Sequence, residues 1–323
     1  MKTKALPALD GLRVLATVGI FLFHAGFLLN GTFPVTLFFM LSGFMMYYTK
    51  RDDIHPVTGI MKMRRMYPLH LLTFLISIIV WEPWGKYTLE FLMKAGILHL
   101  TLLQAWFPQY TFTYNGLAWY LSITLFLYII SYPLVLLTRK IKKPLPVILL
   151  LLLLNMAINC AFHREAHLNL YTNPVYRVLD FLLGMVIAKY YLDNGNLTEK
   201  TANIIELMLI PWLLVQYGLS FVVGYTPGYY SVLFTASLYI FAVGKGCISK
   251  ILSLPLFHRL AAYSFEFYMV HELVLRVFRK VFSDETIFYP IRCVMIAVPA
   301  LVVSVIFTWT YKKRPFVKVE RER

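Results

Sequence analysis

Charged residues are scarce in this chain, and acidic residues are scarcer than basic ones. Aspartate and glutamate together account for 16 of the 323 residues, and the charged types as a whole make up only 15%. A soluble globular domain carries nearer to one quarter charged residues, so this composition excludes an ordinary soluble domain. Hydrophobic residues reach 59% and mean hydropathy is +0.66, which is typical of an integral membrane protein.

Cysteine and the short motifs of metal and esterase chemistry are also lacking. The three cysteines, Cys160, Cys247 and Cys293, are too few and too widely spaced for a disulfide framework or a CxxC metal site. Neither HExxH nor GxSxG occurs, so metal-dependent hydrolysis and a serine-esterase elbow have no support. We therefore expect no metal cofactor, and chemistry that depends on other polar residues.

Long apolar stretches are what the chain has in abundance. About ten of them are long enough, or nearly so, to cross a hydrocarbon core, which takes roughly 20 helical residues. The sequence therefore predicts an all-α integral membrane protein, a bundle of about ten transmembrane helices. It forms one domain over residues 1–323, with no appended soluble domain. The expected spans are residues 8–28, 33–49, 66–82, 116–138, 145–161, 174–192, 203–223, 229–244, 257–278 and 286–311.

The net charge of +15 lies mostly at alternate ends of these stretches. With ten spans, the largest basic groups, residues 50–65 and 139–143, fall on one side of the membrane together with both termini. An excess of lysine and arginine marks the cytoplasmic side, which predicts a multi-pass protein of the cell membrane with both termini cytoplasmic. The basic charge thus indicates topology and not nucleic-acid binding, although it can also attract an anionic cytosolic ligand.

Two ionisable residues, Arg13 and His24, lie eleven positions apart within the first apolar stretch. At about 100° per residue they return to within roughly 20° of one helix face, separated by a rise of about 16 Å. An ionisable group inside a membrane span is costly and by default marks a functional site. We interpret the pair as a polar track that begins near the cytoplasmic mouth and ends at a buried histidine.

Two further polar groups occur near the second and third spans, and each has a structural alternative. Ser42 and Gly43 form a small pair in a bulky helix, which favours close helix packing over ligand contact. Lys62, Arg64 and Arg65 are either an ordinary positive-inside anchor or a site for the phosphates of a nucleotide-like cofactor.

Later spans carry polar residues at helical spacing. Arg177 and Asp180 are three residues apart, so they can neutralise each other, and a structural ion pair is favoured over substrate binding. Ser264, Tyr268 and His271 share one stripe of the ninth span. A buried histidine on such a stripe is consistent with either a structural hydrogen bond or an active-site role.

Five segments, in order, resemble the acyltransferase 3 family, whose members are integral membrane enzymes that O-acylate bacterial cell-surface polysaccharides. The resemblance covers almost the full chain and is carried by LDGLRVLATVGIFLFH, LFFMLSGFMMYY, RRMYPLHLL, YRVLDFLLGMVIA and YSFEFYMVHELV. It implies transfer of an acyl group, acetyl being expected, from cytosolic acyl-CoA. The implied acceptor is a hydroxyl of a cell-surface or lipid-linked glycan, and membrane lipid surrounds the protein.

The chain departs from the family pattern at two places. Lys62 stands where the family often has the first of two arginines, and lysine keeps the charge but loses the planar fork. The segment WYLSITLFLY, residues 119–128, has Thr124 and Leu125 where the family has acids. Glu266 is the expected replacement for the missing acid.

The resemblance, together with the residues, assigns roles within this reaction. A sugar hydroxyl is a poor nucleophile that needs a base, and buried imidazole, with an ordinary pKa near 6.5, is neutral and basic at physiological pH. His24 is the expected general base, and a covalent acyl-imidazole is the less favoured alternative. Arg13 would hold the cofactor or a developing negative charge, while His271 would orient His24 or line the acceptor side.

The remaining assignments concern binding. The residues expected to bind cofactor phosphates are Lys62, Arg64 and Arg65. The residues expected at the substrate are Ser42, Arg177, Ser264, Glu266 and Tyr268.

A multi-pass transporter or flippase is the alternative function. In that reading Arg13, His24, Arg177 and His271 form a substrate or proton pathway. The sequence shows no inverted repeat and no paired Gly/Pro-broken helices, which counts against a transporter. A purely structural scaffold would leave the polar stripes unexplained.

Overall fold

The computed structural model describes residues 4–28, 33–81, 86–162, 169–223, 227–282 and 289–312. Within these ranges the chain is built from helices joined by turns, without a β-strand, and the predicted all-α fold is confirmed. In chain order the α-helices are α1 (Pro7–His24), α2 (Pro34–Lys50), α3 (Thr58–Val80), α4 (Leu89–Leu100), α5 (Trp119–Ile129), α6 (Ser131–Lys140), α7 (Pro144–Phe162), α8 (Arg177–Asn194), α9 (Glu199–Val223), α10 (Pro227–Val243), α11 (Cys247–Leu252), α12 (Pro255–Ala261), α13 (Ser264–Val281) and α14 (Tyr289–Lys312).

Five helices of the described chain are long and apolar enough to cross a membrane: α1, α3, α7, and most of α9 and α14. The α5–α6 pair meets the same condition only as one bent unit, and α10 is apolar but shorter. Length and composition therefore support five or six spans within the described residues, fewer than the ten that were predicted. The termini, residues 1–3 and 313–323, lie outside the described residues.

Two predicted spans are each divided in the structure. Residues 116–138 form α5 and α6, which meet at a 55° bend. Pro133 lies in the first turn of α6, and because proline has no N–H it cannot donate to the carbonyl of Ile129, where α5 ends. Residues 257–278 are likewise split between α12 and α13, and the break places Ser264 at the start of α13.

The third span begins earlier than predicted. Helix α3 starts at Thr58 and includes Pro68 in its interior, so Lys62 and Arg65 lie on the helix itself and not ahead of it. An interior proline removes one backbone hydrogen bond. The basic residues therefore lie on the first turns of a helix whose later turns bury one face, with Leu69, His70 and Thr73.

The centre of the helical bundle is a close crossing of α2 and α8. A Cβ placed on Gly43 would lie 1.9 Å from the Phe181 carbonyl oxygen, and one on Gly184 would lie 1.9 Å from that of Met40. The two helices therefore meet backbone to backbone, which only glycine permits at these positions. The close-packing role predicted for the Ser42–Gly43 pair is confirmed at Gly43.

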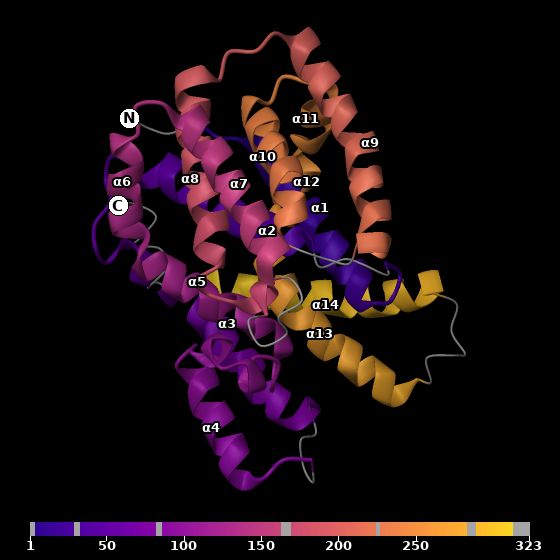
Figure 1. Ribbon diagram of the computed structural model, residues 1–323. Coiled ribbons are helices and arrows are strands. Elements are labelled where there is room, and N and C mark those ends of the chain that lie inside the picture. Colours follow the sequence, from indigo (N-terminus) through magenta and orange to yellow (C-terminus); the bar gives the residue numbers. More distant parts are fainter. Residues whose placement is uncertain are drawn as a thin grey trace.

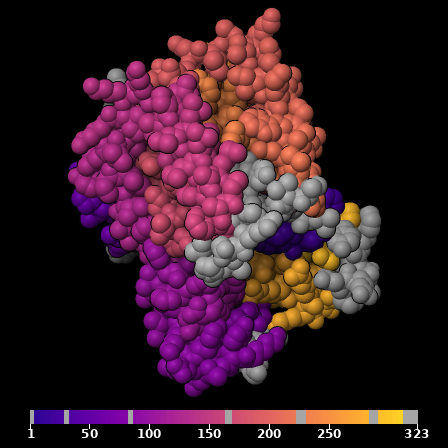
Figure 2. All heavy atoms as spheres, in the orientation of Figure 1, coloured from indigo at the N-terminus to yellow at the C-terminus, as the bar shows by residue number. Residues whose placement is uncertain are grey.

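Helix α1 packs beside the bundle that the α2–α8 crossing centres (Figure 1). Helices α2, α7, α8 and α10 stand together as an upright bundle, and α9 lies beside α10. Helices α3 and α4 extend below it and form a separate lobe on the surface shown in Figure 2. Helix α1 contacts α2, α10, α11, α12 and α13, so its side chains face several parts of the protein at once. Residues on α1 can therefore take part in sites that distant segments complete.

Candidate active site: two adjoining cavities beside α1

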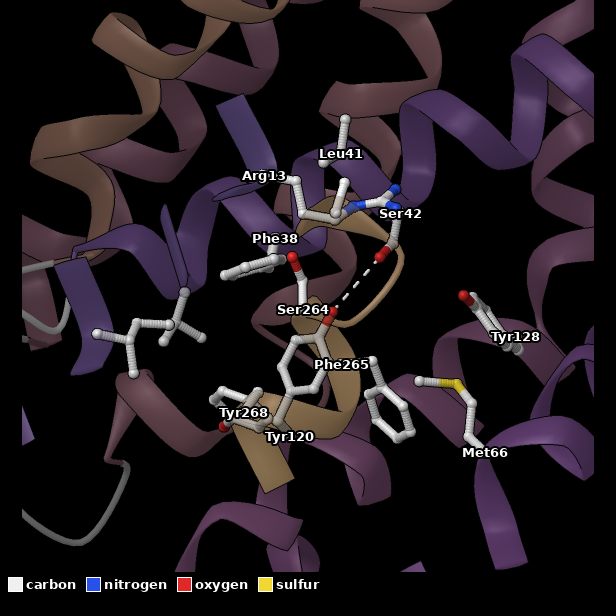
Figure 3. A pocket seen from close by; sticks show the side chains of 13 residues that line it. Arg13, Phe38, Leu41, Ser42, Met66, Tyr120, Tyr128, Ser264, Phe265 and Tyr268 are labelled. Carbon is white, nitrogen blue, oxygen red and sulfur yellow. Dashed lines mark hydrogen bonds between the residues drawn. The ribbon is translucent and has the colours of Figure 1, made fainter. Parts of the chain in front are cut away.

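A first cavity of about 220 Å³ lies between α1, α2, α3, α5 and α13 (Figure 3). Its lining combines apolar side chains with one guanidinium and several hydroxyl groups. The polar members are Arg13, Ser42, Tyr120, Tyr128, Ser264 and Tyr268. Four of these six, Arg13, Ser42, Ser264 and Tyr268, are residues that the sequence predicted for the site. The structure therefore brings together predicted residues that lie up to 255 positions apart in the chain.

The polar groups of this cavity face one another. The Ser42 hydroxyl lies 3.4 Å from the Tyr120 hydroxyl, and the dashed line in Figure 3 marks this contact. Arg13 extends from α1 toward Ser42 in the same view, and its charge acts on the hydroxyls of Tyr120 and Tyr128. A guanidinium among hydroxyl donors suits a ligand that carries oxygen atoms with negative charge.

A second cavity, of about 380 Å³, adjoins the first. Its charged and titratable members are His24, Glu272 and Arg276, and its aromatic walls are Phe23, Phe112, Trp119, Tyr171 and Tyr268. Ile20, Val35 and Tyr268 line both cavities, so these three side chains form the boundary between them. Arg13 thus lines one cavity and His24 the other, where the sequence had predicted one continuous polar track.

His24 is paired with His271 across the interface of α1 and α13. The Nδ1 atom of His24 lies 2.9 Å from Nε2 of His271, and the rings are nearly parallel with centroids 5.2 Å apart. The other ring nitrogen of His271, Nδ1, lies 3.0 Å from the Phe267 carbonyl oxygen. His271 is buried and does not line either cavity, whereas His24 lines the second.

Three hydrogen bonds join α13 to residues 114–117, a segment that contributes Gly116 and Leu117 to the second cavity. Arg276 donates to the Tyr114 carbonyl at 2.8 Å, and the Tyr268 hydroxyl donates to the Leu117 carbonyl at 3.2 Å. Asn115 donates its amide to the Met269 carbonyl at 3.1 Å. Tyr114 has a positive φ of 51°, so this turn has a backbone shape that the bonds to α13 help to hold.

Of the basic residues of α3, Lys62 lies at the border of the first cavity. The Lys62 ammonium is 5.8 Å from the ring centroid of Tyr128, which lines the cavity. The positive charges of Arg13, Lys50 and Arg65 all act on Lys62. Arg64 and Arg65 are exposed, and neither lines a cavity. Lys62 thus contacts a side chain that lines the cavity.

Arg177 lines neither cavity, although it contacts Tyr171, which lines the second. Its guanidinium is completely buried and contacts the Asp180 carboxylate at 2.6 Å, so the predicted ion pair is present. It also donates to the Tyr171 carbonyl at 2.8 and 3.0 Å and to the Thr36 hydroxyl at 3.0 Å. Asn155 in turn donates to Asp180 at 3.3 Å. These bonds engage all three guanidinium nitrogens inside the protein, which favours a structural role.

Of the acids on α13, Glu272 lines a cavity and Glu266 does not. Glu266 lines neither cavity, whereas Glu272 lines the second and accepts a hydrogen bond from Arg276 at 3.0 Å. The sequence indicated the Glu272–Arg276 pair by its i,i+4 spacing, but no feature of it placed the pair beside His24. Thr124, where the family has an acid, donates its hydroxyl to the Tyr120 carbonyl at 2.7 Å.

The sequence also did not predict the aromatic walls of the second cavity. Trp119 and Tyr171 come from separate segments and meet with ring centroids 4.8 Å apart. Among the described residues, no group of three or more His, Cys, Asp or Glu side chains is arranged to hold a metal ion.

Comparison with known proteins gives one family match and one curated relative. Residues 6–309 match the profile of the family described as Acyltransferase domain (Acyl_transf_3). The chain is 28% identical over 327 residues to "Acyltransferase MdmB" of Streptomyces mycarofaciens, a match that covers 87% of this chain and 81% of that protein. No solved structure matches the chain. The resemblance seen in the five sequence segments is confirmed.

Proposed function

The chain belongs to this Acyltransferase domain family. On that premise we propose that it is a membrane O-acyltransferase that transfers a small acyl group, acetyl. The donor is acyl-CoA, and the acceptor is a hydroxyl of a cell-surface or lipid-linked glycan. The observation that carries the proposal is the pair of adjoining cavities, because one presents Arg13 beside a basic border and the other presents His24.

The first cavity suits the thioester end of the donor. About 220 Å³ is below the usual range of roughly 300–1,000 Å³ for sites that enclose a whole drug-sized ligand, so the nucleotide part of acyl-CoA would remain outside. Lys50, Lys62 and Arg65 would meet its phosphates there, while Arg13 lies further in. Arg64, exposed beside them, would add to the attraction of the polyanionic donor.

The reaction follows from the meeting of the two cavities near Ile20, Val35 and Tyr268. His24 removes the proton from the acceptor hydroxyl, whose oxygen attacks the thioester carbonyl carbon. The new C–O bond forms, the C–S bond breaks, and the proton passes from His24 to the thiolate of the departing CoA. Arg13 and the hydroxyls of Ser42 and Tyr120 would stabilise the negative charge that develops on the carbonyl oxygen.

The aromatic second cavity suits a sugar acceptor. Trp119, Tyr171 and Tyr268 offer flat apolar faces, while Glu272 and Arg276 offer an acceptor and donors for hydroxyl groups. Mass spectrometry of surface glycans from cells with and without this chain tests the acceptor class. We expect acylated sugars only in cells that contain it, and identical glycans in both would contradict the proposal.

We further propose that the chain is one membrane-embedded domain of the cell membrane, with about ten spans and both termini in the cytoplasm. The basis is the distribution of lysine and arginine. In this topology α2, α8 and α10, whose packing buries much of their surface, count as spans although they are short or carry charges. The basic border of the first cavity then faces the cytoplasm, where acyl-CoA occurs.

Replacing Arg65 with alanine is expected to raise KM for acyl-CoA about 10-fold with little change in kcat, because one charge-assisted contact to phosphate is lost. Steady-state kinetics at low and high salt would measure the change. Lys142→Ala, which removes an exposed cation between α6 and α7, is the matched control and should leave KM unchanged. A fall in kcat alone would remove Arg65 from the donor site.

Replacing Val35 with alanine is expected to shift donor preference toward longer acyl chains. Val35 lines both cavities, so removing two carbon atoms adds space where the acyl group must lie. The ratio of kcat/KM for butyryl-CoA to that for acetyl-CoA should rise about 10-fold. A hydrophobic pocket usually discriminates by about this factor between substrates that differ by one or two methylene groups. Val18→Ala, on the exposed face of α1, is the control. An unchanged ratio would place the acyl group elsewhere.

A further inference from the structure

The direction of each hydrogen bond at the His24–His271 pair follows from a backbone carbonyl. A carbonyl oxygen only accepts, so the His271 Nδ1 atom, 3.0 Å from the Phe267 oxygen, must carry a hydrogen. A neutral imidazole has one hydrogen, which leaves His271 Nε2 as an acceptor. His24 Nδ1, 2.9 Å away, must then donate to it.

The neutral form of His271 is the one that its surroundings favour. Its ring is buried against the aromatic rings of Phe21, Phe267 and Tyr268. A buried charge is costly without a partner of opposite sign, and these rings supply none. Three charged groups on α13 act electrostatically on His24: Glu272, Arg276 and Arg279.

With the Nδ1 hydrogen in place, His24 presents a lone pair at Nε2. Among the described residues, Nε2 has no hydrogen-bond partner, and His24 lines the second cavity while His271 does not. Because His271 engages Nδ1, Nε2 is the ring nitrogen left to meet a ligand in the second cavity, and it is the basic one. The reverse tautomer would turn an N–H toward the cavity and could not accept a proton.

We propose that His271 is a positioning residue that holds His24 in the tautomer whose Nε2 atom is the base, and that the acceptor hydroxyl binds in the second cavity. This inference rests on the proposed function. It divides the two substrates between the cavities, with the thioester in the first and the acceptor hydroxyl beside His24 in the second. Phe267 contributes through its backbone carbonyl, which fixes His271 in turn.

The His24–His271 pair ends the step in the protonation state in which it began. Nε2 of His24 takes the hydroxyl proton as the C–O bond forms, and the resulting imidazolium keeps its Nδ1–H bonded to His271. The negative charge of Glu272 offsets the positive charge on His24 during the step. The same Nε2 proton then passes to the thiolate as the C–S bond breaks, which returns the pair to its starting state.

Two amide variants of His271 separate its two hydrogen bonds. The side-chain amide of glutamine reaches about as far as Nε2 of histidine, so His271→Gln can still accept from His24. The amide of asparagine occupies the place of Nδ1, so His271→Asn can keep the bond to Phe267 but not the bond to His24. Both variants lose the ring and differ from each other by one methylene group, so the loss of the ring is common to both.

We expect His271→Asn to lower kcat about 100-fold with little change in KM for either substrate. That loss is smaller than the roughly 10,000-fold loss known for a triad whose charged orienting residue is changed, because His271 is neutral. His271→Gln should retain kcat to within about 10-fold. In ¹⁵N-histidine NMR spectra, His24, assigned by the His24→Ala variant, should show one tautomer in the wild type and a mixture in His271→Asn.

Equal kcat values in the asparagine and glutamine variants would overturn the positioning role, as would a wild-type spectrum in which His24 carries its hydrogen on Nε2. These outcomes are distinct from failure of the proposed function. If the wild-type protein transferred no acyl group, the function would fail while the NMR tautomer remained testable. If His24→Ala transferred normally, the base itself would be wrong.

Discussion

Replacing His24 with alanine is expected to lower the rate of acyl transfer about 1,000-fold while leaving the amount of folded protein unchanged. A general base contributes roughly 100- to 10,000-fold, and no other imidazole lines either cavity in the described part of the chain. His24 lies at the end of α1, where its loss removes one hydrogen bond to His271 without opening the bundle core. Transfer of radiolabel from acetyl-CoA to glycan, beside a melting curve in detergent, measures both effects.

His55→Ala is the control for this variant. His55 is an exposed histidine in the turn before α3, so its loss should change neither rate nor melting temperature. Residual activity within about 10-fold of the wild type in His24→Ala would remove the base from this site. Mass spectrometry of the protein after incubation with acetyl-CoA alone would reveal an acetyl group on His24 if transfer were covalent instead.

Replacing Arg177 with methionine is expected to destabilise the protein by about 3–5 kcal/mol, because it leaves the buried Asp180 carboxylate without its cation. The Tyr171 carbonyl and the Thr36 hydroxyl would also lose a donor. Adding Asp180→Asn should recover part of the loss, since asparagine carries no charge and can still bond Asn155. Chemical or thermal unfolding in detergent, followed by tryptophan fluorescence, compares the variants.

Lys189→Met is the control on the same helix. Lys189 lies 3.7 Å from Asp193, which is half exposed, so loss of that ion pair should cost less than about 1 kcal/mol. Normal stability of Arg177→Met, together with a raised KM for the glycan, would contradict a structural role. Arg177 would then bind substrate, which is the other role that the sequence allowed.

The placement of Arg13 and His24 shows what the sequence can predict. Helical periodicity places them on one face of α1, and in the structure Arg13 lines the first cavity while His24 lines the second. The ion pair of Arg177 and Asp180 was predictable for the same reason, since contacts three residues apart follow from helix geometry alone.

Contacts between distant segments could not be predicted from the sequence. His24 and His271 are separated by 247 positions, and only the packing of α1 on α13 brings their ring nitrogens to 2.9 Å. Glu272 and Trp119 join the second cavity for the same reason. The division of residues 116–138 did have a local signal in Pro133, but apolar length outweighed it in the prediction of one span.

The most direct test of the account is acyl transfer by the purified protein in detergent, given radiolabelled acetyl-CoA and surface glycans from the cells that make it. We predict that label becomes covalently attached to the glycan with the wild-type protein and not with His24→Ala. Unlabelled glycan, together with movement of the glycan or its lipid-linked precursor across liposomes that contain the protein, would contradict the account and indicate a transporter.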